Sequence, residues 1–312
     1  MPQVLISDRT HEVLAQRLQQ AGIETRVEPD HDYESLIRAA QGCQGLVVRS
    51  KVTIDRAFID RVPSLKCIGR VGAGMETIDV EYAESRGIRC LNSPEGNRDA
   101  VGEHAVGILL ALLNNIARAD SEVRRGLWRR EENRGYELGA LTVGIIGFGN
   151  MGRAFAQRLS GFGCRILYYD KYLVDSPTLP GVQRVSLQEL QAEADVVSFH
   201  VPLTQETRHY LDAPFIATMG RPFFLVNTAR GAVVDTAALA QGIECGKVRG
   251  AALDVLEYEN MSADTLGQVP PSVQYLQESP RTVLTPHIAG WTVESKYKLA
   301  AVLADKIIEV LK

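Results

Sequence analysis

One glycine-rich turn constrains the fold of this chain more than any other part of its sequence. It has the pattern G-x-G-x-x-G over residues 147–152, follows an apolar stretch at 143–146 and precedes a stretch with helical spacing at 153–160. Glycines at these places let a strand and the next helix pack closely across a tight turn. The sequence therefore predicts a β-strand, a turn and an α-helix here, as in a parallel α/β sheet.

The same turn predicts a binding site for a dinucleotide. Gly147 would make the tight turn, Gly149 would let the backbone approach a pyrophosphate, and Gly152 would allow the helix to pack on the strand. The backbone N–H groups at the start of the helix, at Asn150 and Met151, would then face the phosphates. A chance glycine loop is the alternative, and the flanking strand and helix argue against it.

Asp170 predicts which dinucleotide binds. It ends the next predicted strand, 164–169, close to the offset of roughly 20 residues at which a carboxylate reaches the adenosine ribose. Its charge would repel a 2′-phosphate, which favours NAD over NADP, although Lys171 beside it weakens this preference. A second glycine turn, at 71–76, has neither a third glycine nor an acidic residue ending the next strand, so we interpret it as a substrate loop.

Short apolar stretches alternate with longer amphipathic stretches along the whole chain. This alternation is typical of a mostly parallel sheet covered by helices, so the predicted fold class is α/β. In the first third of the chain, strands are predicted at 4–7, 45–49, 65–70 and 88–92, and helices around 11–21, 33–40 and 79–86. A second series begins at residue 141, with strands predicted near 143–146, 164–169, 195–200, 223–227, 249–253 and 282–285.

The two series predict two doubly wound domains with parallel sheets. A loop at 92–97 is expected to separate them, followed by a long helix over 98–118. The helical pattern at 291–312 comes after the second sheet, and we expect it to return to the first domain. The predicted organisation is a flavodoxin-like substrate domain with an NAD-binding Rossmann domain inserted into it, with residues 1–95 and 289–312 in the first and 96–288 in the second.

The composition of the 312 residues narrows the classes of function. With 34 basic and 38 acidic side chains the net charge is −4, which provides no bulk attraction to nucleic acid or to an anionic membrane. The five cysteines form no C-x-x-C pair, so neither a disulfide framework nor a zinc site is expected. Neither a signal peptide nor an apolar stretch near the roughly 18 residues of a membrane span is visible. We therefore expect a cytoplasmic protein without a metal, whose partner is a small molecule.

Several segments together carry a resemblance to a known family. They are residues 49–50, 68–74, 92–97, 147–152, 200–204, 227–231, 252–255 and 285–290. On these segments the chain resembles the D-isomer-specific 2-hydroxyacid dehydrogenases over nearly its full length. Within that family it is most similar to the phosphoglycerate dehydrogenase branch, in a form without the regulatory domain of longer members.

The resemblance implies three catalytic residues. Arg230 would bind the substrate carboxylate, His287 would exchange a proton with the C2 hydroxyl, and Glu259 would stabilise the charged imidazole. The chemistry independently calls for these residue types, because an arginine fork matches a carboxylate and histidine titrates near neutral pH. Spacing alone does not show which of the six histidines exchanges the proton with the substrate. We interpret His104 as a core or hinge residue, and three others as surface residues: His11, His31 and His209.

The resemblance also implies further contacts to the cofactor. Asp254 would bind the nicotinamide carboxamide, with the alternative that it only caps the following turn. Val201 and Pro202 would lie beside the cofactor, with the alternative that they only end a strand. The complete set of implied contacts beyond the glycine turn and Asp170 is His200, Val201, Pro202, Thr207, Thr228, Ala229, Arg230, Asp254, His287 and Gly290.

Substrate choice is expected to lie in the first domain. Arg49, Ser50 and Arg70 match positions that resemble the phosphate and carboxylate contacts of phosphoglycerate dehydrogenases. Two arginines suit a dianion, and the alternative is that both are ordinary solvated residues at strand ends. The remaining implied substrate contacts are Gly72, Ala73, Gly74 and Asn97.

Two residues depart from the family pattern. Asn260 stands where the family usually has proline, at the start of a long surface loop expected over 260–280, and Trp291 replaces a small residue. The resemblance further implies a homodimer joined through the NAD-binding domain, with the helix 98–118 and the basic stretch 124–130 as the candidate contact. A solvated charged surface is the alternative for the basic stretch.

These residues predict NAD-dependent oxidation of a D-2-hydroxy acid. The first hypothesis is oxidation of 3-phosphoglycerate to 3-phosphohydroxypyruvate in serine biosynthesis. The second is a hydroxypyruvate or glyoxylate reductase, which needs no phosphate-binding arginines. The third is a non-catalytic NAD-sensing corepressor or binding protein on the same fold. Formate oxidation is disfavoured, because Glu259 would keep protonated a histidine that this reaction does not use as a base.

Overall fold

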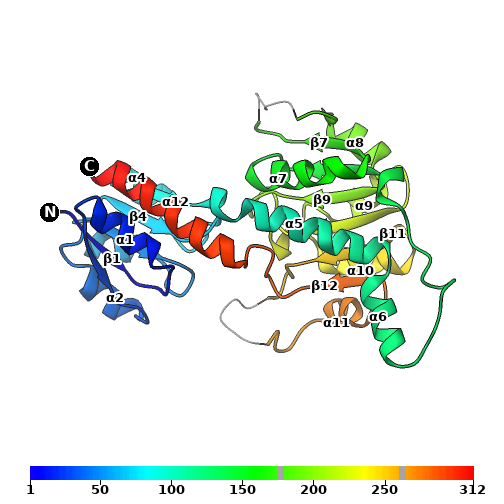
Figure 1. Ribbon diagram of the computed structural model, residues 1–312, viewed down its shortest axis with the longest axis horizontal. Helices are drawn as coiled ribbons and strands as arrows, with labels where there is room; N and C mark the ends of the chain where they lie inside the picture. The colour runs from blue at the N-terminus through cyan, green and yellow to red at the C-terminus, as the bar shows by residue number, and fades with distance from the viewer. Residues whose placement is uncertain (174–178, 260–264) are drawn as a thin grey trace. The chain divides into compact units, whose positions relative to one another are not determined.

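The chain folds into two compact units (Figure 1). The structure is a computed structural model and describes residues 1–173, 179–259 and 265–312. Unit 1 contains Met1–Arg98 together with Trp291–Lys312, and unit 2 contains Asp99–Gly290. The chain therefore passes between the units twice, after Arg98 and after Gly290.

Unit 1 is built on a five-stranded parallel sheet with the order β2-β1-β3-β4-β5. This is the flavodoxin-like strand order. The strands are β1 (Gln3–Ile6), β2 (Glu24–Val27), β3 (Gly45–Val48), β4 (Cys67–Arg70) and β5 (Arg89–Asn92). The helices are α1 (Val13–Gln20), α2 (Tyr33–Ala40), α3 (Arg56–Arg61), α4 (Val80–Ser85) and α12 (Val293–Leu311).

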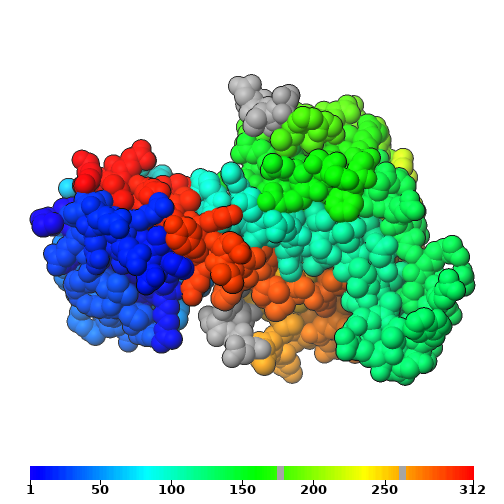
Figure 2. All heavy atoms as spheres, viewed as in Figure 1, coloured from blue at the N-terminus to red at the C-terminus, as the bar shows by residue number. Residues whose placement is uncertain are grey.

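Both faces of this sheet are covered by helices. One apolar core joins the sheet to α1 and α12, and the other joins it to α2, α3 and α4. The C-terminal helix α12 begins with a capping box between Thr292 and Ser295, and it buries Leu299, Leu303 and Ile307. In Figure 2 the last residues of the chain (red) lie against the first residues (blue) on the surface of unit 1. The final helix therefore belongs to the first sheet.

Unit 2 is built on a seven-stranded parallel sheet with the order β12-β11-β10-β9-β6-β7-β8. Its strands are β6 (Thr142–Ile146), β7 (Arg165–Tyr169), β8 (Val182–Arg184), β9 (Val196–Phe199), β10 (Phe223–Asn227), β11 (Val248–Leu253) and β12 (Thr282–Leu284). Its helices are α5 (Pro94–Leu113, which begins in unit 1), α6 (Ile116–Arg124), α7 (Asn150–Leu159), α8 (Leu187–Glu193), α9 (Ala213–Thr218), α10 (Thr236–Glu244) and α11 (Pro271–Glu278). Short 3₁₀ turns lie at Leu138–Ala140, Ser160–Phe162 and Gly231–Val233.

The strand order of unit 2 reverses beside β6. From β6 the chain builds outward through β7 and β8, and it then returns to β9 on the other side of β6. Figure 1 shows α5 and α7 side by side over one face of the sheet, where a single apolar core contains both. A second core on α8, α9, α10 and α11 covers the other face. In open parallel sheets, ligands bind at the carboxyl ends of the strands where the order reverses.

The expected loop at 92–97 and the single helix over 98–118 are both wrong. Helix α5 already begins at Pro94, because a proline fits the first helical position, where its missing N–H has no partner to lose. It ends at Leu113, and Asn115 adopts a left-handed φ of 54° before α6 turns away by 61°. No single helix in the described parts of the chain is long and apolar enough to cross a membrane; α5 and α6 meet that test only as a bent pair.

The expected surface loop over 260–280 is also partly wrong. Helix α11 occupies Pro271–Glu278, because a proline at its first position starts the helix and Val273 and Leu276 are buried one turn apart. Residues 260–264, including Asn260, lie outside the described residues. The strands β2 and β8 were not predicted, since both are edge strands with largely exposed side chains.

Candidate functional site

The glycine turn joins β6 to α7 at the point where the strand order reverses. Gly147 has a φ of +90°, and a Cβ there would lie 2.7 Å from the carbonyl oxygen of His200. A side chain at Gly152 would overlap the carbonyl of Gly147, so this position also requires glycine.

Gly149 leaves the start of α7 open. A Cβ at Gly149 would have nothing within 4 Å, and this residue caps α7 without a side-chain hydrogen bond. The N–H groups of Asn150 and Met151 in the first turn are therefore not covered by a capping side chain. A pyrophosphate fits such a helix start, since it accepts hydrogen bonds and carries negative charge.

Asp170 ends β7 beside the glycine turn. Its Oδ2 accepts the N–H of Phe148 at 2.7 Å, and its Oδ1 accepts two N–H groups of the following turn, including that of Tyr172 at 3.0 Å. The ammonium group of Lys171 pairs with Glu206 instead of standing alone beside Asp170. A negative charge thus lies next to the turn, while its neighbouring positive charge is already paired.

The loop after β9 contains four of the residues implied in cofactor binding. His200 is half-buried, and burial lowers its pKa to about 3, so the ring is neutral. Its Nε2 lies 2.8 Å from Ser198 Oγ, whereas its Nδ1 is buried without a partner among the described residues. The hydroxyl of Thr207 donates to the carbonyl of Pro202 at 2.6 Å. These contacts hold the loop, in which Val201 is half-buried, next to Gly147.

The loop after β10 holds Arg230 in a tight turn. The Asn227 side chain accepts the N–H of Ala229 and donates to the carbonyl of Arg230, both at 3.0 Å. The buried hydroxyl of Thr228 has no hydrogen-bond partner among the described residues. Because a buried hydroxyl without a partner is costly, this one suits a polar group of a bound ligand.

Gly231 brings the loop after β10 against the loop after β11. A side chain at Gly231 would overlap the backbone of Leu256 and Glu257, so the two loops touch only because this residue has no Cβ. Arg230 lies directly before the contact and Glu259 follows shortly after it. The structure thus brings the loops of two implied catalytic residues together.

His287 and Glu259 form a hydrogen-bonded pair. Nδ1 of His287 lies 2.8 Å from Oε1 of Glu259, and about a quarter or less of each side chain is exposed. The other carboxylate oxygen of Glu259 accepts the N–H of Leu256 at 3.2 Å. With Glu259 on Nδ1, the second ring nitrogen, Nε2, is the one left for proton transfer.

Asp254 directly follows β11 and is only 1% exposed. Oδ1 accepts hydrogen bonds from the Thr285 hydroxyl and the Ile288 N–H, and Oδ2 accepts one from the Ala289 N–H at 2.8 Å. Burial opposes ionisation of this carboxyl, but the nearby His104 ring and the hydrogen bonds from Thr285 and the backbone outweigh it, so its pKa is lower than usual. Asp254 therefore holds a charged carboxylate against the segment of His287 and Gly290.

The residues implied in substrate binding gather at the carboxyl edge of the unit 1 sheet. Arg49 and Ser50 follow β3, and Arg70 ends the adjacent parallel strand β4. The Arg70 guanidinium lies against Gly72, where a side chain would overlap it. The rest of that turn, Ala73 and Gly74, is tied to the end of β5, since Asn92 donates to the carbonyl of Ala73 at 2.6 Å.

Two further side chains lie in the same unit. Asn97 is in the first turn of α5, not in a loop, and its Oδ1 is buried without a partner among the described residues. The guanidinium of Arg49 lies 5.3 Å from the centre of the Trp291 ring, which is the geometry of a cation–π contact. The bulky residue that departs from the family pattern thus contacts one of the two arginines expected to bind the substrate.

Three polar or small residues of unit 2 were missed or misjudged from the sequence. His104 contacts Thr285 and Asp254, although a polar residue on an apolar helix was its only signal. Gly231 lies in the segment 227–231 that carries the resemblance, but nothing in the sequence indicated that it brings two loops together. The His209 side chain is 40% exposed, in keeping with the surface position expected for it, but its pairing with Glu257 at 2.5 Å was not foreseen. All three depend on residues distant in sequence.

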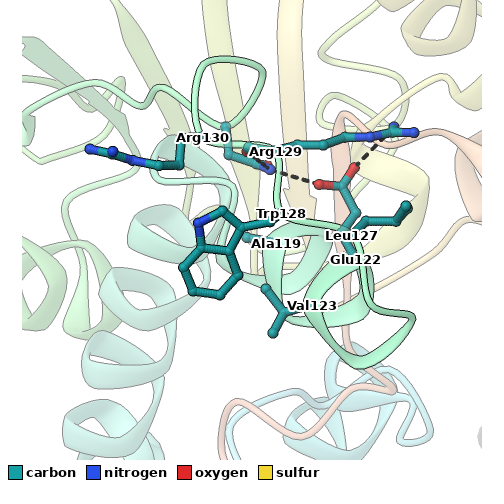
Figure 3. Close-up of a pocket in the computed structure, with 8 residues that line it drawn as sticks. Ala119, Glu122, Val123, Leu127, Trp128, Arg129 and Arg130 are labelled. Atoms are coloured by element: carbon teal, nitrogen blue, oxygen red, sulfur yellow. Dashed lines mark hydrogen bonds and ion pairs between the residues drawn. The ribbon is translucent and has the colours of Figure 1, made fainter.

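The basic stretch 124–130 lies in a protruding part of unit 2, at α6 and the segment that follows it (Figure 1). Buried Glu122 accepts a hydrogen bond from Asn133 at 2.7 Å and lies 3.7 Å from Arg129 (Figure 3). Trp128 is 79% exposed beside Val123. This segment therefore exposes apolar side chains among paired charges.

Comparison with protein families gives a match to the D-isomer specific 2-hydroxyacid dehydrogenase, NAD binding domain, over residues 106–289. A curated relative, the D-3-phosphoglycerate dehydrogenase of Methanocaldococcus jannaschii, is 35% identical over 314 residues. The match covers 100% of this chain and 58% of the relative, so the chain spans less than two thirds of that protein.

Two other comparisons cover both partners almost fully. The hydroxypyruvate reductase of Thermotoga maritima is 37% identical over 292 residues, which is 92% of this chain and 92% of the relative. The crystal structure of D-lactate dehydrogenase from Aquifex aeolicus, complexed with NAD and lactic acid, superposes with a TM-score of 0.79 at 28% identity and covers 99% of this chain and 94% of that chain.

Proposed function

Because the chain belongs to the D-isomer-specific 2-hydroxyacid dehydrogenase family, we propose that it is an NAD-dependent dehydrogenase of D-2-hydroxy acids. The observation that carries this proposal is the pair of His287 and Glu259, 2.8 Å apart, on loops anchored next to that of Arg230. Unit 2 is the NAD-binding domain in this proposal, and unit 1 is the substrate domain.

His287 moves the proton. In the direction of oxidation, its Nε2 accepts the proton of the C2 hydroxyl, while the proton on Nδ1 stays hydrogen-bonded to Glu259. The ring becomes positively charged, and the carboxylate of Glu259 stabilises that charge. Bound NAD would supply the acceptor for the hydride that leaves C2 with both bonding electrons as the carbonyl forms. In reduction, His287 returns the proton to the new hydroxyl oxygen.

Arg230 orients the substrate. Its Nη1 donates to the carbonyl of Ala229 at 2.6 Å, which fixes the guanidinium close to the turn after β10. A guanidinium presents its N–H donors in a planar fork that matches the two oxygens of a carboxylate, so Arg230 is the residue proposed to bind the substrate carboxylate. This two-point contact orients C2 of the acid relative to His287.

Asp170 selects NAD over NADP in this proposal. In Asp170→Asn we expect the ratio of kcat/KM for NAD to that for NADP to fall about tenfold or more, since a hydrogen bond to a charged group is lost together with the repulsion of a 2′-phosphate. Asparagine keeps an acceptor for the Phe148 N–H, so the glycine turn stays in place. Steady-state kinetics with both cofactors checks the ratio, and an unchanged value would rule out the ribose contact.

For the substrate we propose 3-phosphoglycerate, oxidised to 3-phosphohydroxypyruvate at a step of serine biosynthesis. Arg49 and Arg70, at the ends of adjacent strands, supply two guanidinium groups for the phosphate and carboxylate of such an acid. The 35% identity to a D-3-phosphoglycerate dehydrogenase supports the same choice.

A substrate panel tests this choice. Steady-state rates are compared for 3-phosphoglycerate, phosphohydroxypyruvate, hydroxypyruvate, glyoxylate and D-lactate, in the wild type and in Arg70→Gln. We expect the wild type to prefer the phosphorylated pair and Arg70→Gln to lose that preference while retaining turnover on the unphosphorylated acids. Equal rates of the wild type on phosphorylated and unphosphorylated acids would contradict a phosphate-binding role for Arg49 and Arg70.

A hydroxypyruvate reductase is the second candidate. One observation favours it: the Arg49 guanidinium already stacks on Trp291, which leaves less of it for a phosphate. The relative of this activity is also similar in length, with 92% of each chain covered. Preference for hydroxypyruvate in the same panel would select this candidate and leave the roles of His287, Glu259 and Arg230 unchanged.

We propose a homodimer joined through unit 2. Ile116, Val123 and Trp128 are each more than half exposed, and the charges around them have both signs, so the patch can pair with a second copy of itself. The double variant Val123→Glu/Trp128→Glu should be monomeric by sedimentation, whereas Val293→Glu, at an 85% exposed residue of unit 1, should remain dimeric. A wild type that is monomeric at assay concentration would contradict the proposal.

The cysteines fit the proposed cytoplasmic setting. All five are free thiols. Burial raises the pKa of Cys67 to about 12 and that of Cys90 to about 11, so neither forms a reactive thiolate near neutral pH. A reducing compartment leaves such residues as buried apolar side chains.

A further inference from the structure

His104 has no part in the reaction proposed above, yet it lies among its residues. Its Nε2 is 3.0 Å from Oγ1 of Thr285 and 3.4 Å from Oδ1 of Asp254. About a fifth of the side chain is exposed. Helix α5 therefore presents an imidazole to a hydroxyl and a carboxylate inside unit 2.

The hydrogen bonds among these three residues have a defined direction. The Thr285 hydroxyl lies 2.6 Å from Oδ1 of Asp254 and donates its only proton to that carboxylate. Its oxygen can then only accept from His104, which must carry its proton on Nε2. The result is a chain in which His104 donates to Thr285 and Thr285 donates to Asp254.

Asp254 in turn holds three consecutive N–H groups. Its backbone carbonyl accepts the N–H of His287 at 2.7 Å. Its side chain accepts the next two, the N–H of Ile288 on Oδ1 at 2.9 Å and the N–H of Ala289 on Oδ2 at 2.8 Å. His287 itself has a φ of 55°, in the left-handed region that is strained for a residue with a side chain. Strained residues keep such a conformation only where several surrounding contacts fix it.

The same contacts join the two segments through which the chain leaves unit 2. His104 lies on α5, the helix in which the chain passes from Arg98 to Asp99. Ala289 immediately precedes Gly290, the last residue of unit 2 before Trp291. The Asp254 carboxylate thus binds one connecting segment through side chains and the other through backbone N–H groups.

We propose that His104 is a positioning residue for proton transfer: through Thr285 it orients the Asp254 carboxylate, which fixes the backbone of His287 so that the ring stays on Glu259. This role rests on the proposed function only for its kinetic consequence, since the hydrogen bonds that fix the 287–289 backbone exist without substrate. His104 touches neither substrate nor cofactor in this role.

Two substitutions of His104 distinguish the effect of its N–H group from the effect of its ring volume. His104→Phe keeps a planar ring but removes the donor, whereas His104→Gln places an N–H group close to the position of Nε2. Glu103→Gln, at the neighbouring and more exposed residue of α5, is the matched control. For each we would measure kcat, KM, the dissociation constant for NADH and the amide hydrogen exchange of the peptide that spans residues 285–290.

In His104→Phe we expect kcat to fall about tenfold or more, because small displacements of a catalytic group are costly. The dissociation constant for NADH should stay within about twofold of the wild type, and the amides of residues 287–289 should exchange faster. His104→Gln should recover most of kcat and of the amide protection, and Glu103→Gln should match the wild type. If His104→Phe does not fold, Thr285→Val breaks the same chain of hydrogen bonds at its second member.

A wild-type kcat together with wild-type amide exchange in His104→Phe would overturn the proposal. So would a His104→Gln that is as impaired as His104→Phe, because then the N–H group is not what matters. If the wild type itself turns over no hydroxy or keto acid, the proposed function fails, while the amide exchange still decides whether His104 fixes the His287 backbone.

Discussion

Replacing His287 with alanine is expected to lower the rate of hydroxy-acid oxidation about 1,000-fold, in the middle of the range that general acid–base catalysis contributes. The variant loses the ring that is hydrogen-bonded to Glu259, and with it the group proposed to accept the hydroxyl proton. The substitution leaves the glycine turn and its contact with Asp170 in place, so NADH should still bind with most of its affinity. Steady-state kinetics and an NADH titration measure the two quantities.

A second histidine–carboxylate pair in the same unit offers the control. His209 lies 2.5 Å from Glu257, and Glu257 also accepts hydrogen bonds from the backbone and hydroxyl of Thr236. His209→Ala therefore leaves Glu257 anchored, and its turnover should stay within a few-fold of the wild type. Equal losses in His209→Ala and His287→Ala would show that general damage to unit 2, not a lost base, explains the effect.

Replacing Arg230 with lysine is expected to lower kcat/KM about 100-fold, which corresponds to the loss of one strong hydrogen bond to a charged group. Lysine keeps the positive charge but cannot bind both oxygens of a carboxylate in one plane. It also gives up the hydrogen bond from Nη1 to the carbonyl of Ala229. Most of the loss should appear in KM, with a smaller fall in kcat from the poorer orientation of C2.

Arg165→Lys is the matched control for this substitution. Arg165 is a half-exposed arginine at the start of β7 that pairs with Glu193, away from the carboxyl ends of the strands. It should leave both kinetic constants unchanged. An Arg230→Lys variant with wild-type kcat/KM would mean that another cation binds the substrate carboxylate.

The parts of the fold that follow local rules were predictable. The glycine turn identified β6 and α7, because glycine spacing and an apolar strand act within a few residues of each other. Both parallel sheets followed from the alternation of apolar and amphipathic stretches, and the α/β class with two doubly wound sheets is confirmed. The flavodoxin-like order of the first sheet matches the prediction as well.

The errors in the fold have local physical causes. Pro94 and Pro271 were interpreted as loop residues, although a proline at the first position of a helix costs nothing and even favours it. Asn115 ended α5 because asparagine tolerates a left-handed backbone, which helical periodicity cannot show. The edge strand β2 lacks the apolar alternation on which strand prediction depends.

The candidate site was predictable where a residue comes soon after a predicted strand. Asp170 and Asp254 come directly after strands, and Arg230 and His287 follow shortly after theirs, so their shared edge of the sheet could be expected. The chain of hydrogen bonds from His104 to Asp254 could not, because it joins residues more than a hundred positions apart through one hydroxyl. Such contacts depend on packing and leave no periodic pattern in the sequence.

The central claim is that this chain transfers hydride between a nicotinamide cofactor and a small 2-hydroxy or 2-keto acid. The most direct measurement follows the absorbance of NADH while the purified protein is mixed with phosphohydroxypyruvate, hydroxypyruvate and glyoxylate in turn, beside a titration of NADH binding. We expect NADH to bind and to be consumed with at least one of these keto acids, and consumption to be lost in His287→Ala. Tight NADH binding with no consumption on any of them would contradict the account and leave an NAD-sensing protein on this fold.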